Sequence, residues 1–255
     1  MVVVRDISVE TIGSIRWITL DRPERRNALS MPMLEALAES ITLPPSGKER
    51  VILLAAEGMA FCSGLDLTTR RKEGTPLGGS PIEAVLEALD HSILPTVASV
   101  NGAAIAGGCE LALNCDIIVA NRTAFFSMPL TRIGTAPTWD LVVRLVDRVG
   151  ASIARELLLV GDPVSADRLA GCGVVRVVDQ TEKNEAARQV AMGIAEGAPL
   201  AVRAVRAAFT LQSKRSVVVD HLAVDQLVQA ARQSADAREG VAARLERRRP
   251  KFKGL

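Results

Sequence analysis

The chain has 255 residues, of which 31 are Lys or Arg and 29 are Asp or Glu, so its formal net charge is +2. With acids and bases interspersed, no overall field favours nucleic acid or an acidic membrane, and we expect neither as a partner. The length suits one α/β core with a small helical addition and excludes a second full catalytic domain.

The N-terminal part of the sequence predicts strands. β-Branched residues predict two strands, over residues 2–9 and 13–20, which form a hairpin that turns at Gly13. Ser30 predicts the start of a helix that runs to about residue 40, because its side chain can cap the first turn. The continuous apolar run at residues 51–55 is typical of a strand buried in a parallel sheet.

Strands and helices alternate through the middle of the chain. The predicted elements are a polar loop at 68–81, a helix at 82–93, a strand at 96–100, a helix from Gly107, a strand near 116–120, helices at 138–149 and 151–160, and a strand at 174–178. This alternation indicates an α/β fold. From about residue 184 the pattern is helical only, and its alanine-rich apolar stripes need a partner surface. We therefore divide the chain into a core, residues 1–190, and a C-terminal helical oligomerisation region, residues 191–255.

The helix at Gly107 carries the first chemical signal. Gly107 and Gly108 open it, and Glu110 follows within the first turn. The first amides of a helix lack intrahelical partners, so they can hold an anion or a developing oxyanion. Residues three apart share a helix face, which places Glu110 where it can move a proton beside a carbonyl held at Gly107. This combination predicts enolate chemistry.

A second loop, residues 57–67, also follows a strand and ends in a Ser-Gly-Leu-Asp turn that can supply another amide. Together with the Gly107 segment it belongs to a set of five motifs. They are Ile-Thr-Leu-Asp-Arg-Pro followed by Arg-Asn-Ala-Leu (18–29), Phe-Cys-Ser-Gly-Leu-Asp-Leu (61–67), Gly-Gly-Cys-Glu-Leu-Ala (107–112), Cys-Asp-Ile-Ile-Val-Ala (115–120), and a terminal Glu-Gly with Arg-Arg-Arg-Pro-Lys-Phe-Lys (239–253). In this order and spacing, over nearly the whole length, the chain resembles the crotonase, or enoyl-CoA hydratase/isomerase, superfamily.

The resemblance implies a crotonase-like spiral of ββα units with a C-terminal helical region that trimerises, often as a dimer of trimers. It implies an acyl-CoA thioester substrate whose carbonyl oxygen accepts hydrogen bonds from the N–H groups of Leu65 and Gly107, with Glu110 as acid and base. The side chain of Leu65 would line and narrow the acyl pocket. The residues that it implies for coenzyme A binding are Arg25, Arg26, Ala28, Ser63 and Arg247.

Hydratases of this family usually carry a second glutamate, which shares the handling of the water molecule, and this chain lacks it. Leu130 stands there, at the acyl pocket, and leucine cannot move a proton. Asp140 is a candidate auxiliary acid, although an aspartate at this place is more often a first-turn or cap residue. Three functions therefore stay open: a hydratase-type enzyme, an isomerase that uses Glu110 alone because no water is added, and a non-catalytic acyl-CoA-binding protein.

No metal or redox cofactor is expected, and coenzyme A is expected only as part of the thioester substrate. The four cysteines form no Cys-x-x-Cys pair and the chain has only two histidines. This pattern predicts neither a disulfide framework nor a zinc site. Because there is no basic region followed by a long apolar stretch at the start, and no apolar run of about 18 residues, we expect a soluble, cytoplasmic protein.

Overall fold

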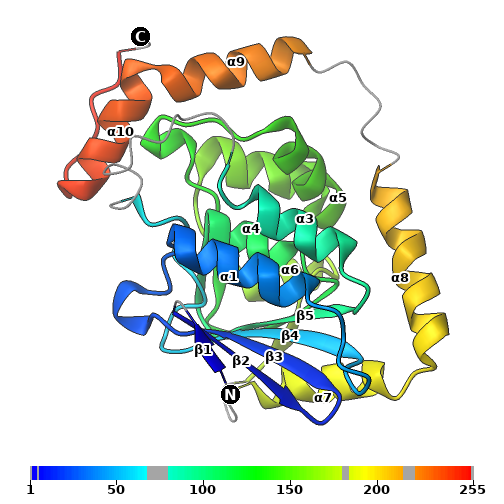
Figure 1. Ribbon diagram of the computed structural model, residues 1–255. Coiled ribbons are helices and arrows are strands. Elements are labelled where there is room, and N and C mark those ends of the chain that lie inside the picture. Colours follow the sequence, from blue (N-terminus) through cyan, green and yellow to red (C-terminus); the bar gives the residue numbers. More distant parts are fainter. Residues whose placement is uncertain (1, 5, 68–79, 180–183, 215–221, 254–255) are drawn as a thin grey trace.

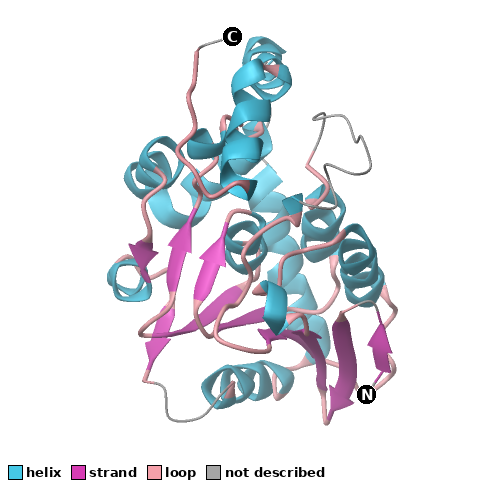
Figure 2. Ribbon diagram, turned by 90° about the vertical axis from the view of Figure 1, so that its left-hand side faces the viewer, coloured by secondary structure: helices cyan, strands magenta, loops and turns pink. Residues whose placement is uncertain are grey.

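The computed structural model describes residues 2–4, 6–67, 80–179, 184–214 and 222–253 (Figure 1). Most of the loop predicted at 68–81 lies outside these ranges. The predicted α/β class is confirmed, because helices cover both faces of a central sheet (Figures 1 and 2). In the part of the chain that the structure describes, no helix combines the length and the apolar character that crossing a membrane requires.

The central sheet has seven strands. In their order across the sheet they are β1 (Val2–Val4), β2 (Ile7–Ile12), β3 (Ile15–Leu20), β4 (Val51–Ala56), β5 (Thr96–Val100), β7 (Ile117–Asn121) and β10 (Arg176–Val178). The first three strands are antiparallel and the others are parallel to β3 and to one another. All six residues of β4 are buried, as a continuous apolar run predicts for a central parallel strand.

The N-terminal strand prediction was wrong in one respect. Residues 2–9 do not form one strand, because the chain turns at Asp6, whose φ of 66° lies in the left-handed region. The result is a separate edge strand, β1, which pairs antiparallel with β2 so that Val4 faces Ile7. The predicted turn at Gly13, with φ of 61°, is confirmed between β2 and β3.

Two helical layers enclose the sheet. On one face lie α1 (Met31–Thr42), α3 (Glu83–His91) and α4 (Gly107–Leu113), whose apolar sides belong to the main hydrophobic core (Figure 1). On the other face lies α7 (Glu185–Ala195), which packs Ala187 and Ala191 against the buried residues of the sheet. The predicted division between residues 190 and 191 falls within this helix.

A second, three-stranded sheet was not predicted. It consists of β6 (Ala103–Ile105), β8 (Phe125–Ser127) and β9 (Val164–Ser165), and α6 (Ala166–Gly171) follows it. Strands of two or three residues are too short to show a period, which is why the pattern did not reveal them. Because β6 and β8 are parallel, the residues that follow them, Gly107 and Leu130 included, lie at one end of this sheet.

The predicted break between the helices at 138–149 and 151–160 is confirmed at Gly150. Helix α5 runs from Trp139 to Arg155, but Gly150 (φ 76°, ψ 158°) kinks it near the predicted boundary. A π-helical turn, Glu156–Val160, continues from its end. Thr138 caps the start, because its side-chain oxygen accepts a hydrogen bond from Leu141 N at 3.2 Å.

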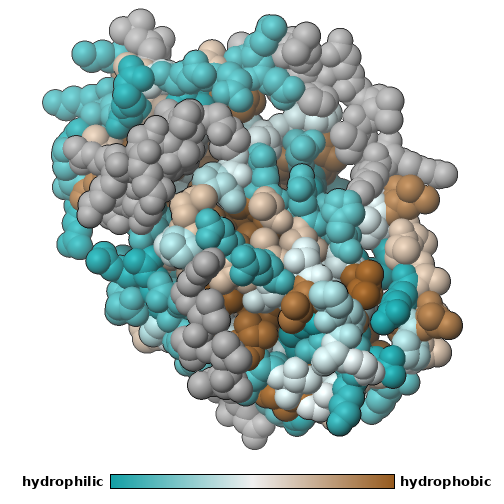
Figure 3. Space-filling view, viewed as in Figure 1, coloured by the Kyte–Doolittle hydropathy of each residue, from teal (hydrophilic) through white to brown (hydrophobic). Residues whose placement is uncertain are grey.

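The C-terminal part is helical, as predicted, with α8 (Pro199–Lys214), α9 (Leu222–Gln233) and α10 (Ala235–Leu245) after α7. Helix α8 stands along one side of the core (Figure 1). It exposes a row of large apolar side chains, which Figure 3 shows in brown at the right-hand edge. They are Leu200, Val205, Phe209 and Leu211.

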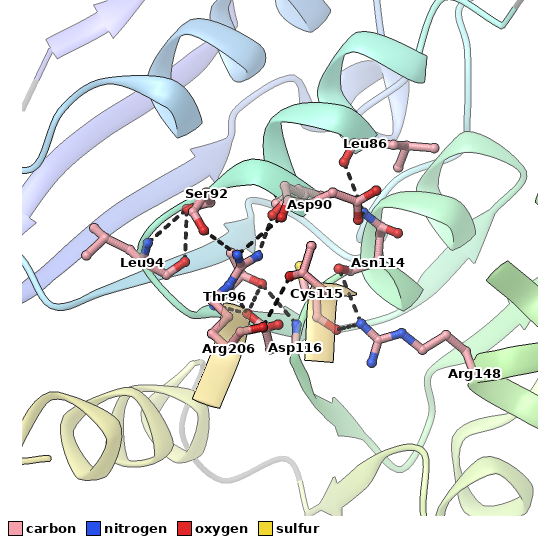
Figure 4. A network of polar contacts seen from close by, with 12 residues as sticks. Leu86, Asp90, Ser92, Leu94, Thr96, Asn114, Cys115, Asp116, Arg148 and Arg206 are labelled. Atoms are coloured by element: carbon pink, nitrogen blue, oxygen red, sulfur yellow. Dashed lines mark hydrogen bonds and ion pairs between the residues drawn. The ribbon is translucent and has the colours of Figure 1, made fainter. Parts of the chain in front are cut away.

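One arginine ties α8 to the core (Figure 4). Arg206 donates from Nε to Asp116 Oδ2 at 3.0 Å, and its other nitrogens donate to the carbonyl oxygens of Ser92 and Leu89. The same Asp116 oxygen accepts from the backbone N–H of Thr96 at 2.7 Å. The aspartate of the Cys-Asp-Ile-Ile-Val-Ala motif therefore connects two neighbouring strands with a helix from the end of the chain.

Candidate active site

Two loops meet at the start of α4. Backbone hydrogen bonds join Cys62 N to Ala103 O at 3.0 Å and Ile105 N to Cys62 O at 2.9 Å, so the segment after β4 runs beside β6. Gly64 follows with φ of 91°, and a Cβ added to it would lie 3.4 Å from the backbone nitrogen of Gly107. Gly64, the residue before Leu65, therefore lies directly against the Gly107 amide.

The direction of the Leu65 amide follows from the other edge of this segment. Leu29 N donates to Gly64 O at 2.8 Å and Asp66 N donates to Leu29 O at 2.9 Å. This parallel bridge uses the groups on either side of Leu65, so the N–H of Leu65 points away from Leu29. Among the described residues, neither Leu65 N–H nor Gly107 N–H has a hydrogen-bond acceptor. The two amides are therefore available to a ligand.

Close packing explains the glycines at the start of α4. Ala106, the residue before the helix, has φ of 48° and donates its N–H to Ser127 O at 2.8 Å. A Cβ on Gly108 would overlap the carbonyl oxygen of Cys62 and lie 2.7 Å from its Cβ. Only glycine allows the helix to begin this close to the neighbouring loop.

Glu110 is half-buried in the first turn of α4. The pKa of its carboxyl group is raised to about 7, chiefly by burial; the positive charges of Arg232 and Arg144 oppose this shift, and the negative charge of Glu83 adds to it. A carboxyl group that titrates near neutral pH can both accept and release a proton under working conditions. This perturbation, beside two unpaired amides, makes the end of the small sheet the candidate active site.

The charged neighbours of Glu110 come from three separate helices, and the sequence did not reveal them. Glu83 begins α3, Arg144 lies on α5 and Arg232 lies on α9. Arg144 is partly neutralised, because its Nη1 lies 2.7 Å from Asp90 Oδ2 and 2.8 Å from Asn114 Oδ1. No local sequence signal indicates that these helices converge.

Leu130 follows β8 and thus lies at the same end of the small sheet as Gly107. It is half-buried and packs against the main hydrophobic core. Asp140 is an exposed residue in the first turn of α5, where Thr138 rather than Asp140 is the cap. Asp140 lines a groove of about 870 Å³ between α5 and α8, and it is not among the charges that shift the pKa of Glu110.

The loop at residues 21–29 lies beside the Ser63 segment. Ser63 N donates to Arg26 O at 3.0 Å, and Ser63 Oγ lies 3.4 Å from Arg25 O. The side chains of Arg25 and Arg26 are exposed and Ala28 is half-buried. The structure therefore brings together four of the five residues that were predicted to bind coenzyme A.

Two residues that the sequence did not single out hold this loop in place. Arg22 Nη1 donates to Asp66 Oδ2 at 2.8 Å and to Ala28 O at 3.0 Å. Asn27 is fully buried with φ of 53°, and its Nδ2 donates to the carbonyl oxygens of Glu57 and Ala60, both at 2.9 Å. Because asparagine tolerates the left-handed conformation, it can turn the chain and fix it at the same residue.

Arg247, the fifth residue predicted to bind coenzyme A, is exposed just after the end of α10. Its φ of 55° places it in the left-handed region. Within the described residues, no hydrogen bond or ion pair joins its side chain to the loop at 21–29. One chain by itself therefore does not link Arg247 to that loop.

The sequence matches one protein-family model and is similar to named relatives. Residues 10–255 match the family model described as enoyl-CoA hydratase/isomerase. The chain is 33% identical over 252 residues to "Probable enoyl-CoA hydratase echA6" of Mycobacterium tuberculosis, covering 97% of this chain and 99% of that protein. It is 32% identical over 241 residues to "2,3-dehydroadipyl-CoA hydratase" of Escherichia coli K12, covering 93% of this chain and 94% of the relative.

Solved structures share the fold. A methylmalonyl-CoA decarboxylase complexed with 2S-carboxypropyl CoA has a TM-score of 0.90 at 25% identity, with full coverage of both chains. An enoyl-CoA hydratase/isomerase from Pseudoalteromonas atlantica has a TM-score of 0.82 at 27% identity, covering 98% of this chain and 100% of that one. These similarities confirm the crotonase-like fold that was predicted from the motifs.

Proposed function

Because the chain belongs to the enoyl-CoA hydratase/isomerase family and is an acyl-CoA enzyme of that family, we propose that it hydrates an enoyl-CoA thioester with Glu110 as acid and base. One observation carries the proposal. Gly64, the residue before Leu65, lies against the Gly107 amide, and the carboxyl group of Glu110, with a pKa of about 7, lies in the first turn of the helix that Gly107 begins.

In the proposed reaction the thioester oxygen accepts hydrogen bonds from the N–H groups of Leu65 and Gly107. Water adds to the β-carbon while its proton passes to the Glu110 carboxylate, and the C–C double bond electrons move into the thioester to form an enolate. Glu110 then returns the proton to the α-carbon, so that one water molecule is added overall. Each preset donor is typically worth about 3–4 kcal/mol of barrier.

This mechanism needs no metal or redox cofactor, since the thioester itself delocalises the charge. For coenzyme A we propose binding along Arg25, Arg26, Ala28 and Ser63, because exposed cations border this segment. We also propose that the helical region, residues 191–255, forms a trimer or hexamer in which the exposed apolar side chains of α8 are covered and Arg247 reaches the coenzyme A of a neighbouring subunit.

Leu130 favours a second candidate, an enoyl-CoA isomerase. Moving a double bond requires a proton to leave one carbon and return to another, which a single carboxylate can do without a second acid to handle water. The same residue would also suit a protein that binds acyl-CoA without turnover. In all three cases the thioester oxygen accepts hydrogen bonds from the same two amides, those of Leu65 and Gly107.

Absorbance measurements separate these functions. We expect the purified protein to remove the conjugated absorbance of crotonyl-CoA as the double bond is hydrated. An isomerase would leave crotonyl-CoA unchanged and instead create conjugated absorbance from a 3-enoyl-CoA. Acyl-CoA binding without either change would contradict hydration and support the binding protein.

Replacing Leu130 by glutamate is expected to raise kcat for crotonyl-CoA hydration, by about 10-fold or more. A carboxyl group at this end of the small sheet would share the handling of water with Glu110, and general acid–base catalysis contributes at least about 100-fold where a positioned group is present. Leu130→Gln is the matched control, because it adds a polar group that cannot exchange protons. Equal rates for the two variants would show that a missing acid does not limit the enzyme.

A further inference from the structure

Arg232 is a charged side chain buried at the candidate active site. Only 7% of its surface is exposed. Among the described residues its one hydrogen bond runs from Nε to the carbonyl oxygen of Ala136 at 3.2 Å, and no carboxylate there lies within the 4.0 Å of an ion pair. A buried charge without a partner is strongly unfavourable, so an unpaired guanidinium indicates that a ligand completes it.

Backbone packing fixes the position of Arg232. Helix α10, which follows directly, lies against the turn between β8 and α5. A Cβ on Gly134 would lie 2.6 Å from the carbonyl carbon of Asp236, and a Cβ on Gly240 would lie 2.7 Å from Ile133 Cα. Contacts this close leave α10 little freedom to shift against this turn, and Arg232 lies only three residues before α10 begins. Its hydrogen bond to Ala136 O joins it to the segment that follows the same turn.

The carboxylates that face Arg232 are too far away to pair with it. Burial lowers the pKa of Arg232, whereas the charges of Glu83 and Glu110 raise it, so both lie within electrostatic range. Neither forms an ion pair with it in the described part of the chain, and the nearby Arg144 is already engaged by Asp90. Arg232 is therefore a cation at the site that no carboxylate of the described residues pairs with, whereas Arg144 has such a partner.

We propose that the enzyme acts on a short acyl-CoA whose acyl group ends in a carboxylate, and that Arg232 binds this carboxylate. The inference rests on the proposed acyl-CoA hydration and names its substrate class. The planar fork of a guanidinium matches a carboxylate with two parallel hydrogen bonds. On the proposed function the acyl chain is short, because Arg232 lies within electrostatic range of Glu110, the carboxyl group proposed to act on the reacting carbons.

The test compares two substrates that differ only at the far end. Glutaconyl-CoA ends in a carboxylate, and pent-2-enoyl-CoA of the same length ends in a methyl group. We expect kcat/KM to be at least about 10-fold higher for glutaconyl-CoA. At pH 9, where Glu110 is ionised with or without the charge of Arg232, Arg232→Gln should lower kcat/KM for glutaconyl-CoA about 100-fold and that for pent-2-enoyl-CoA far less, since only the charged group loses its partner. Arg232→Lys should retain part of the preference.

Arg238→Gln is the matched control, because Arg238 is exposed on α10 and, among the described residues, donates only to Gln233 O. It should leave the substrate preference unchanged. A parent enzyme that prefers pent-2-enoyl-CoA, or an Arg232→Gln variant that slows both substrates equally, would overturn the proposal.

Binding of unreactive analogues separates this inference from the proposed reaction. If neither enoyl-CoA is hydrated, hydration is wrong, but calorimetry with glutaryl-CoA and valeryl-CoA still tests the role of Arg232. We expect glutaryl-CoA to bind about 10-fold more tightly to the parent and no more tightly to Arg232→Gln. Equal affinities for the parent would refute carboxylate recognition.

Discussion

Replacing Glu110 by glutamine is expected to lower kcat for enoyl-CoA hydration about 1,000-fold, within the range of a lost general acid–base group. Glutamine keeps the size and the hydrogen-bonding capacity of the side chain, but it cannot take a proton from water or return it to the α-carbon. Steady-state kinetics with crotonyl-CoA measures the loss. Glu156→Gln is a suitable control, because Glu156 lies on the π-helical turn and pairs with Arg168. If Glu110→Gln turns over as fast as the parent, Glu110 is not the catalyst.

The pH dependence gives an independent test of the same residue. Because burial raises the pKa of Glu110 to about 7, the ionised base is lost as the pH falls below this value. We expect kcat/KM of the parent to rise through this region and the residual activity of the glutamine variant to lack the step. The profile reports on Arg232, Glu83 and Arg144 as well, since their charges act on the same carboxyl group.

Stability should change in the opposite direction to activity. A carboxyl group whose pKa is raised from 4.5 to about 7 on folding destabilises the native state as the pH rises through that range. The cost is fully present at pH 8 and absent at pH 4. Glu110→Gln should therefore be more stable than the parent at pH 8 by ~2–3 kcal/mol, and the difference should disappear toward pH 4. Urea unfolding at both pH values checks this sign.

The elements with strong local signals were predictable. Strand β4 is apolar throughout because it is buried on both faces, and α1 begins at Ser30, whose side chain accepts a hydrogen bond from Met33 N at 3.3 Å. The break at Asp6 was not predictable, since aspartate adopts a left-handed φ only in some contexts. The small sheet was missed because its strands are too short for a pattern to develop.

The candidate site was predictable only in part. Its backbone component follows from glycines and motif order, and in the structure Gly64, the residue before Leu65, lies against Gly107. Its electrostatic component depends on which helices meet. Glu83 lies on α3 and Arg232 lies on α9. An amphipathic pattern predicts that a helix packs on one face, but it does not identify the element on which the helix packs. For that reason the residue that we propose for substrate recognition appeared only in three dimensions.

Gly108→Ala is expected to destabilise the protein by about 3 kcal/mol, the upper end of the usual cost of overpacking. The added methyl group would overlap the Cys62 carbonyl and lie 2.7 Å from its Cβ, so α4 and the neighbouring loop would have to separate. This movement would also part the amides of Leu65 and Gly107. Losing one such donor typically costs 100-fold or more, and we expect kcat/KM to fall by about that factor.

Two measurements keep these effects apart. Urea unfolding gives the stability, and kcat/KM is taken at a temperature at which circular dichroism shows the variant to be folded. Gly193→Ala is the control, because Gly193 lies in α7 with no atom within 4 Å of an added Cβ. It should leave activity unchanged and stabilise the helix by about 0.5–1 kcal/mol. A folded Gly108→Ala variant with unaltered kcat/KM would contradict this prediction. It would show that the spacing between α4 and the Cys62 loop does not determine how the amides of Leu65 and Gly107 hold the thioester oxygen, because the reaction would tolerate their displacement.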